Sequence, residues 1–108
     1  MPTAISSRTL VVAMQSTALP QIIDVRRQTS FDASERIIAN ATWRNSESIA
    51  DWISALDASQ SVVVYCVHGH EVSQSCVERL EKAGFRASYL EGGFAQWIDE
   101  GHPTILKP

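Results

Sequence analysis

The sequence predicts an α/β fold built on a parallel sheet. Two observations support this: short segments are apolar on both faces, as buried parallel strands are, and segments with helical periodicity fall between them. Strands that alternate with helices imply right-handed crossovers, which keep successive strands parallel. In such sheets the ligand binds beyond the carboxyl ends of the strands, so functional residues are expected at that edge.

Four segments are expected to be strands. Residues 61–66 (SVVVYC) give the strongest signal, and residues 21–25 (QIIDV) and 87–90 (ASYL) share its short, apolar character. Residues 41–43 form a weaker fourth segment. The carboxyl end of the strongest strand is therefore the first place to look for chemistry.

Four helices are expected, over residues 7–15, 46–56, 72–83 and 94–100. Ser7 is a candidate cap for the first helix and Ser46 for the second, because a serine side chain can accept from an unpaired N–H. The third helix carries its apolar side chains on one stripe and is expected to stop at Gly84. The fourth is expected to stop at Gly101.

Composition and charge limit the function. The 108 residues fit one domain over residues 1–108, with 44% hydrophobic and 19% charged residues. The formal net charge of -3 argues against nucleic acid and membranes as partners, since both attract basic surfaces. No apolar run is long enough to span a bilayer, and the run at 10–14 is too short for a secretory signal, so a cytoplasmic location is expected.

The two cysteines, Cys66 and Cys76, are expected to be free thiols, because nothing in the sequence suggests export to an oxidising compartment. Cys76 lies on the apolar stripe of its helix and is interpreted as a core residue. Cys66 instead ends the strongest strand. A free cysteine there is often plain core as well, so its neighbours must decide its role.

The loop after Cys66 predicts a nucleophile. A turn from a strand into a helix presents unpaired backbone N–H groups and the positive end of the helix dipole, which together favour a thiolate. Two histidines and a glycine in this loop serve no core purpose; the histidines add positive charge when protonated, and the glycine lets N–H groups converge. The residues expected to bind substrate are Val67, His68, Gly69, His70, Glu71, Val72 and Ser73, the last of which is expected to open the helix.

Four segments of the sequence, taken together, resemble the signatures of a known family. The string VVVYCVHGHEVS around Cys66 resembles the active-site loop of rhodanese-like sulfurtransferases. Three further segments resemble the family's other signatures in the right order, and the resemblance spans about residues 21–103. These segments are Asp24-Val25-Arg26, Ile38-Ala39-Asn40-Ala41 and the stretch YLEGGFAQW at residues 89–97.

The resemblance implies a five-stranded, largely parallel sheet flanked by helices on both faces. It also implies a sulfurtransferase whose loop cysteine, here Cys66, carries sulfane sulfur as a persulfide. The implied partners are a small sulfur donor such as thiosulfate or a persulfide, and a thiol or cyanide acceptor, with a protein thiol as a further possibility. No cofactor and no metal are implied.

Several residues depart from the family pattern or have more than one interpretation. Asn40 stands where glycine is usual, which is tolerable because asparagine enters the left-handed region more readily than most residues. The loop is one residue longer than in common rhodaneses, and Glu71 stands where relatives often carry an arginine, which puts a dianionic donor in doubt. Arg44 is a weak candidate for contact with the substrate. Asp24 and Arg26 are expected to form a structural ion pair rather than to act in catalysis.

Two other functions remain open. A phosphatase or arsenate reductase of the related type would exploit the longer loop, but the loop has no arginine to clamp an oxyanion. A non-catalytic module that senses sulfur or binds metal could use Cys66, His68 and His70, although three ligands crowded on one loop suit a structural zinc site poorly.

Overall fold

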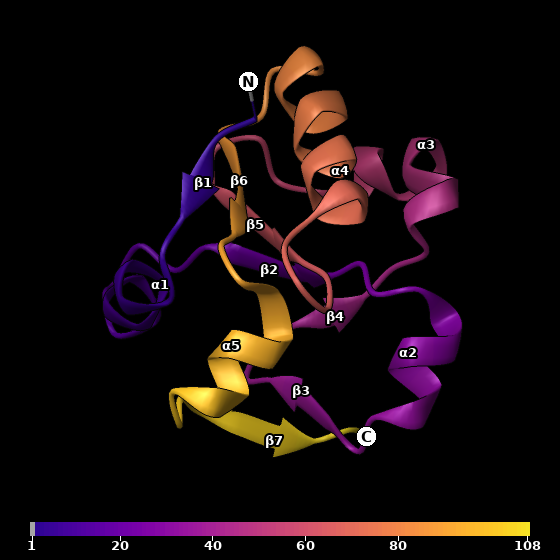
Figure 1. The fold of residues 1–108 in the computed structure, drawn as a ribbon. Helices are drawn as coiled ribbons and strands as arrows, with labels where there is room; N and C mark the ends of the chain where they lie inside the picture. The colour runs from indigo at the N-terminus through magenta and orange to yellow at the C-terminus, as the bar shows by residue number, and fades with distance from the viewer. Residues whose placement is uncertain (1) are drawn as a thin grey trace.

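The computed structural model describes residues 2–108, and its centre is one five-stranded sheet (Figure 1). The strand order is β1-β6-β5-β2-β4, and every neighbouring pair is parallel. The predicted α/β fold and parallel sheet are confirmed. The strands are β1 (Ala4–Ile5), β2 (Gln21–Asp24), β4 (Thr42–Trp43), β5 (Val62–Tyr65) and β6 (Ala87–Leu90).

Helices cover both faces of this sheet (Figure 1). On one side α4 (Glu71–Lys82) and α3 (Ile49–Trp52) pack over a core that includes Val62, Val64 and Cys66. On the other side α1 (Ser7–Met14) and α5 (Gly93–Asp99) pack over a core that includes Val63 and Tyr65. Successive residues of β5 thus enter opposite cores, which explains why its sequence is apolar throughout.

A second, smaller sheet lies below α5 in Figure 1. It pairs β3 (Arg36–Ile38) with β7 (Thr104–Leu106) in antiparallel register. Neither strand was expected from the sequence, because three residues give too short a pattern to separate strand from loop. The two-residue edge strand β1 was missed for the same reason.

The helices differ from expectation in four ways. The segment 46–56 is broken into the 3-10 turn η1 (Ser46–Ser48), the single α-helical turn α3, and a second 3-10 turn, η2 (Ile53–Ala55). The expected caps are each displaced by one residue: the side chains that accept from the first turn are Ser6 and Asn45. Helix α4 begins two residues before the predicted Ser73. The short helix α2 (Gln28–Ala33) was not expected.

The predicted ion pair between Asp24 and Arg26 is confirmed and is buried. The two side chains are 0% and 2% exposed, and Arg26 Nη2 lies 2.6 Å from Asp24 Oδ2. The Tyr65 hydroxyl donates to the same carboxylate oxygen at 3.0 Å and accepts from the Ile38 N–H at 3.2 Å. Because Asp24 ends β2 and Tyr65 ends β5, this network ties the two strands together at the edge where the site lies.

Asn40 adopts the left-handed conformation expected of it, with φ of 70°. It lies in a turn in which the Ala41 N–H donates to the Ile38 carbonyl at 3.0 Å. No helix between residues 2 and 108 combines the length and the apolar character that crossing a bilayer requires.

Candidate active site

Cys66 lies at the carboxyl end of β5 and faces a cavity of about 260 Å³, which we call the Cys66 cavity. The cysteine is 7% exposed, so little of its surface is open to solvent. Most of the predicted substrate-binding residues line the cavity with it. The full lining is Arg27, Ser30, Cys66, Val67, His68, His70, Glu71 and Val72.

The backbone between Cys66 and α4 offers a run of unpaired donors. None of the N–H groups from Val67 to Ser73 donates to a carbonyl or side chain within residues 2–108. The first N–H that does is that of Gln74, which donates to the His70 carbonyl at 3.1 Å. Unpaired N–H groups at the start of a twelve-residue helix favour a negative charge nearby.

Ser73 lies behind the nucleophile rather than in the cavity wall. It is fully buried, and its hydroxyl lies 3.2 Å from Cys66 Sγ. The thiol can donate to this hydroxyl, and the hydroxyl can donate to the sulfur once the thiol is ionised. Ser73 is therefore placed to fix the position of the sulfur in either state.

Gly69 also lies away from the cavity, where it packs on the turn before α5. Its φ is +73°, and a Cβ there would come within 2.7 Å of the Leu90 carbonyl oxygen and 2.9 Å of the Gly92 N. Gly93, with φ of +62°, approaches the loop from the other side; a Cβ on it would lie 2.5 Å from the Cys66 and Val67 carbonyl oxygens. Only residues without side chains permit this contact between the two backbones.

Helix α5 also binds the loop through hydrogen bonds. The Phe94 N–H donates to the Cys66 carbonyl at 2.8 Å, and the Ala95 N–H donates to the Val67 carbonyl at 2.9 Å. From the other side, Gln74 Nε2 donates to the Gly69 carbonyl at 3.0 Å. The loop is thus fixed through its carbonyl groups, which leaves its N–H groups available to a ligand.

Arg27 lines the cavity but was not among the candidate residues expected from the sequence. It directly precedes α2 and lines the Cys66 cavity, together with Ser30. Its place follows from the strand order: β2 and β5 are parallel neighbours with Asp24 opposite Tyr65, so residues that follow β2 lie beside residues that follow β5. The predicted Arg44 is exposed and is not among the residues that line this cavity.

The cavity therefore carries charges of both signs at its mouth. Neither Arg27 nor Glu71 forms an ion pair with any residue between 2 and 108. The carboxylate that repels a dianion is thus accompanied by a guanidinium that attracts one. The two opposite charges partly offset each other toward a dianion.

Cys76 has different surroundings. It is 3% exposed in the core on the α4 side of the sheet, and both cysteines are free. Burial, followed by the nearby Cys66, raises the pKa of the Cys76 thiol to about 11. It therefore stays protonated at neutral pH and is a poor nucleophile.

Within residues 2–108, no group of three or more His, Cys, Asp or Glu side chains is placed to hold a metal ion. The rings of His68 and His70 are 6.3 Å apart, centroid to centroid.

Comparison with known proteins agrees with this arrangement. A family model described as "Rhodanese-like domain" matches residues 7–100. A curated protein named thiosulfate sulfurtransferase GlpE, from Pseudomonas fluorescens (strain SBW25), is 38% identical over 77 residues, which cover 70% of this chain and 68% of that protein.

Solved structures give the same result. A rhodanese-related protein from Thermoplasma volcanium is 26% identical with a TM-score of 0.84, over 97% of this chain and 99% of that one. A rhodanese-like domain protein from Staphylococcus aureus is 27% identical with a TM-score of 0.82, over 98% and 99% of the two chains. The resemblance noted in the sequence is confirmed, and the chain belongs to the rhodanese-like domain family.

Proposed function

We propose that the protein is a sulfurtransferase that carries sulfane sulfur as a persulfide on Cys66. The observation that carries this proposal is the position of Cys66 in its cavity, at the start of a run of unpaired N–H groups that ends at Ser73. Relatives that bear the name thiosulfate sulfurtransferase support the reaction class.

In the first half-reaction the Cys66 thiolate attacks the outer sulfur of the donor. The S–S bond of the donor breaks, its electron pair leaves with sulfite or a thiolate, and a new S–S bond joins that sulfur to Cys66. The negative charge of the persulfide is stabilised by the unpaired N–H groups of the loop and of the first turn of α4. The Ser73 hydroxyl, 3.2 Å from Cys66 Sγ, holds the inner sulfur in place.

In the second half-reaction an acceptor removes the outer sulfur. A thiolate or cyanide attacks it, the persulfide bond breaks, and Cys66 leaves as a thiolate that is ready for the next donor. The product is a new persulfide or thiocyanate. A protein thiol is a further acceptor of the same chemistry. Both steps are nucleophilic exchanges at sulfur, which balance without a cofactor.

Oxyanion chemistry is less well supported. A phosphatase or arsenate reductase needs a guanidinium that holds two equatorial oxygens at once. The loop from Cys66 to Ser73 contains no arginine, and the guanidinium in the cavity wall, that of Arg27, comes from the segment after β2. We therefore expect negligible hydrolysis of an aryl phosphate in an assay that detects sulfur transfer. Robust phosphatase turnover that disappears in Cys66→Ser would replace the proposal.

Mass spectrometry of the intact protein tests the proposal. After exposure to thiosulfate or glutathione persulfide, the protein should gain one sulfur atom. The Cys66→Ser variant should gain none, whereas the matched Cys76→Ala variant should gain one as the wild type does. Sulfur uptake by Cys66→Ser would rule out Cys66 as the nucleophile.

A further inference from the structure

Helix α2 contributes to the wall of the Cys66 cavity, yet little in its own sequence stabilises it. It has six residues, none of which is buried, and its N-cap residue, Arg27, makes no capping hydrogen bond through its side chain. No basic side chain lies in its last turn. A helix this short is marginal in water, so its order depends on contacts with the rest of the chain.

Several of those contacts meet at Phe31, in the middle of α2. The Phe31 ring stacks on Trp43 of β4, with the ring centroids 5.2 Å apart, and Arg26 Cζ lies 5.4 Å from the Phe31 centroid. Trp43 is itself fixed, because its Nε1–H donates to the Arg26 carbonyl at 2.9 Å. One side of α2 is therefore held against the end of the main sheet.

A further contact with Phe31 comes from the other end of the sequence. Lys107 Nζ donates to the Phe31 carbonyl oxygen at 2.6 Å and lies 4.1 Å from the centroid of the Phe31 ring. The Lys107 backbone N–H donates to the Glu35 carbonyl at 2.9 Å, which extends the pairing of β3 with β7 by one residue. In Figure 1 the chain after β7 accordingly ends beside the carboxyl end of α2. Lys107 thus supplies the cation that the last turn of α2 lacks, at the end where a positive charge stabilises a helix.

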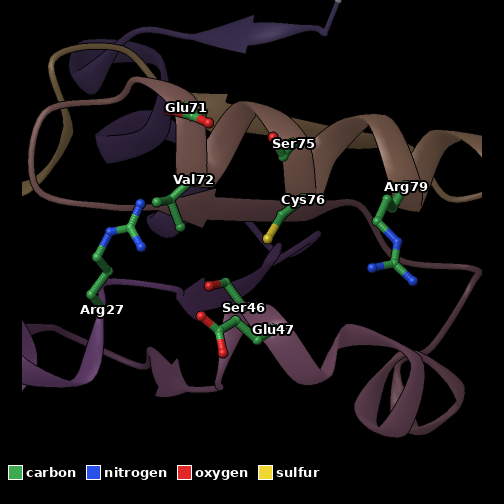
Figure 2. Close-up of a pocket in the computed structure, with 8 residues that line it drawn as sticks. All are labelled: Arg27, Ser46, Glu47, Glu71, Val72, Ser75, Cys76 and Arg79. Carbon is green, nitrogen blue, oxygen red and sulfur yellow. The ribbon is translucent and has the colours of Figure 1, made fainter.

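The other end of α2 lies at the Cys66 cavity. Arg27 and Ser30 line this cavity, and Figure 2 shows the Arg27 guanidinium pointing toward Val72 at the start of α4. The Phe31 N–H donates to the Arg27 carbonyl at 2.9 Å, so a single helical turn connects the residue that Lys107 holds to the residue that faces the cavity. Because Arg27 forms no ion pair with any residue from 2 to 108, its place depends on where α2 holds its backbone.

We propose that Lys107 is a positioning residue for the sulfur donor: it holds the carboxyl end of α2 and so keeps Arg27 at the mouth of the Cys66 cavity, where the guanidinium attracts an anionic donor. The proposal rests on the persulfide function of Cys66. It extends the site beyond residues 7–100, the part of the chain that the family model matches. Without the ammonium group, α2 opens more often and Arg27 spends less time beside the cavity.

Hydrogen exchange tests the contact without any sulfur chemistry. Lys107→Met keeps most of the length of the side chain and removes the ammonium group. The amides of residues 28–33 should exchange about threefold faster in Lys107→Met than in the wild type, whereas Lys107→Arg, which keeps a cation, should stay close to the wild type. Lys82→Met is the matched control, since it removes an exposed lysine from the end of α4 and should leave α2 unchanged. Equal exchange in Lys107→Met and the wild type would overturn the proposal.

Donor preference tests the link from Lys107 to Arg27. The rate of persulfide formation with thiosulfate, divided by the rate with a neutral polysulfide, should fall about threefold in Lys107→Met and stay unchanged in Lys82→Met. In an Arg27→Gln background, Lys107→Met should not change this ratio further, because Lys107 acts through Arg27. An unchanged ratio in Lys107→Met, or a fall of the same size in both backgrounds, would overturn the positioning role. A wild type that takes up no sulfur from either donor refutes the persulfide function itself, and that result is seen before any variant is compared.

Discussion

The two cysteines show how neighbours decide what a side chain does. Both are nearly buried, at 7% and 3% exposed, so burial alone does not separate them. Both belong to the core on the α4 side and each lines a hollow, but Cys66 directly precedes the run of unpaired N–H groups that leads into α4, whereas Cys76 lies within that helix. The sequence already distinguished them, because the histidines and the glycine follow Cys66, and Cys76 lies on a helical stripe.

The raised pKa of Cys76 predicts a loss of stability at alkaline pH. In the unfolded chain the thiol ionises near its ordinary value of 9, but in the folded protein it ionises only near 11. The stability gained by keeping it protonated is complete below pH 9 and is lost as the pH rises through about 11. Urea denaturation should therefore show that the free energy of unfolding of the wild type falls relative to that of Cys76→Ala as the pH rises across this range.

Tyr65 does not disturb this comparison. Burial, followed by the charge of Asp24, raises its pKa as well, but it ionises identically in the wild type and in Cys76→Ala. A difference between the two proteins that stays constant from neutral pH to pH 11 would contradict the assignment of Cys76 as a buried neutral thiol.

The opposite charges of Glu71 and Arg27 are expected to have opposite effects on the rate with a dianionic sulfur donor. Both line the Cys66 cavity, and thiosulfate is a dianion. Glu71→Gln should raise its second-order rate several-fold, and Arg27→Gln should lower it by a similar factor, on the order of 1 kcal/mol at a solvated rim. A neutral polysulfide donor should respond little to either change. Stopped-flow rates at low and high salt give the measurement, and equal effects on both donors would remove these residues from substrate selection.

At the scale of elements, the loop and α5 act as one unit. Gly93 has φ of +62°, and a Cβ there would meet three backbone atoms of the loop within 2.6 Å. Gly101 is a matched control: its φ is +73°, but a Cβ would meet nothing within 4 Å. Gly101→Ala should cost only the strain of the left-handed region, about 1–2 kcal/mol.

Gly93→Ala should cost more stability than this, and it should also displace the loop that holds Cys66. Because misplacement by about 1 Å can slow a reaction by about a hundredfold, persulfide formation should slow at least tenfold. Urea midpoints and single-turnover rates measure the two effects. If both glycine variants keep the wild-type rate, the contact between the Gly69 and Gly93 backbones does not position the nucleophile.

The elements also show what the sequence can and cannot predict. The longer periodic strands and helices were predicted, and so was the two-residue strand β4, but the short strands β1, β3 and β7 and the six-residue helix α2 were not. The caps were displaced because adjacent polar residues compete for the same role: Ser6, in extended conformation, accepts from the Thr9 N–H. Arg27 was missed because its place in the site depends on which strand lies beside β5, which local patterns do not reveal.

At the scale of the whole molecule, the site lies where β2 and β5 end side by side. The strand order brings together residues about forty apart in sequence, as the pairing of Asp24 with Tyr65 shows. The alternation of apolar side chains fixes which face of each strand enters which core. Family signatures predicted the sheet, and the structure adds the register that places Arg27 beside Cys66.

The buried network at this junction supports the last prediction. Arg26 is 2% exposed and donates to both carboxylate oxygens of Asp24, and Asp24 also accepts from Tyr65. Asp24→Asn leaves a buried guanidinium without its counter-ion, which costs about 3–5 kcal/mol. Urea denaturation should show this loss, with Asp51→Asn on α3 as the exposed control that stays within about 0.5 kcal/mol of wild type.

A double variant, Asp24→Asn with Arg26→Met, decides whether the loss comes from the orphaned charge or from the missing links between β2 and β5. Removing both ions also removes the unpaired guanidinium, so stability should partly return if the charge is responsible. The Trp43 Nε1–H, which donates to the Arg26 carbonyl at 2.9 Å, stays in place in every variant because that contact uses the backbone. An Asp24→Asn loss no larger than that of Asp51→Asn would show that the network does not hold the two strands together.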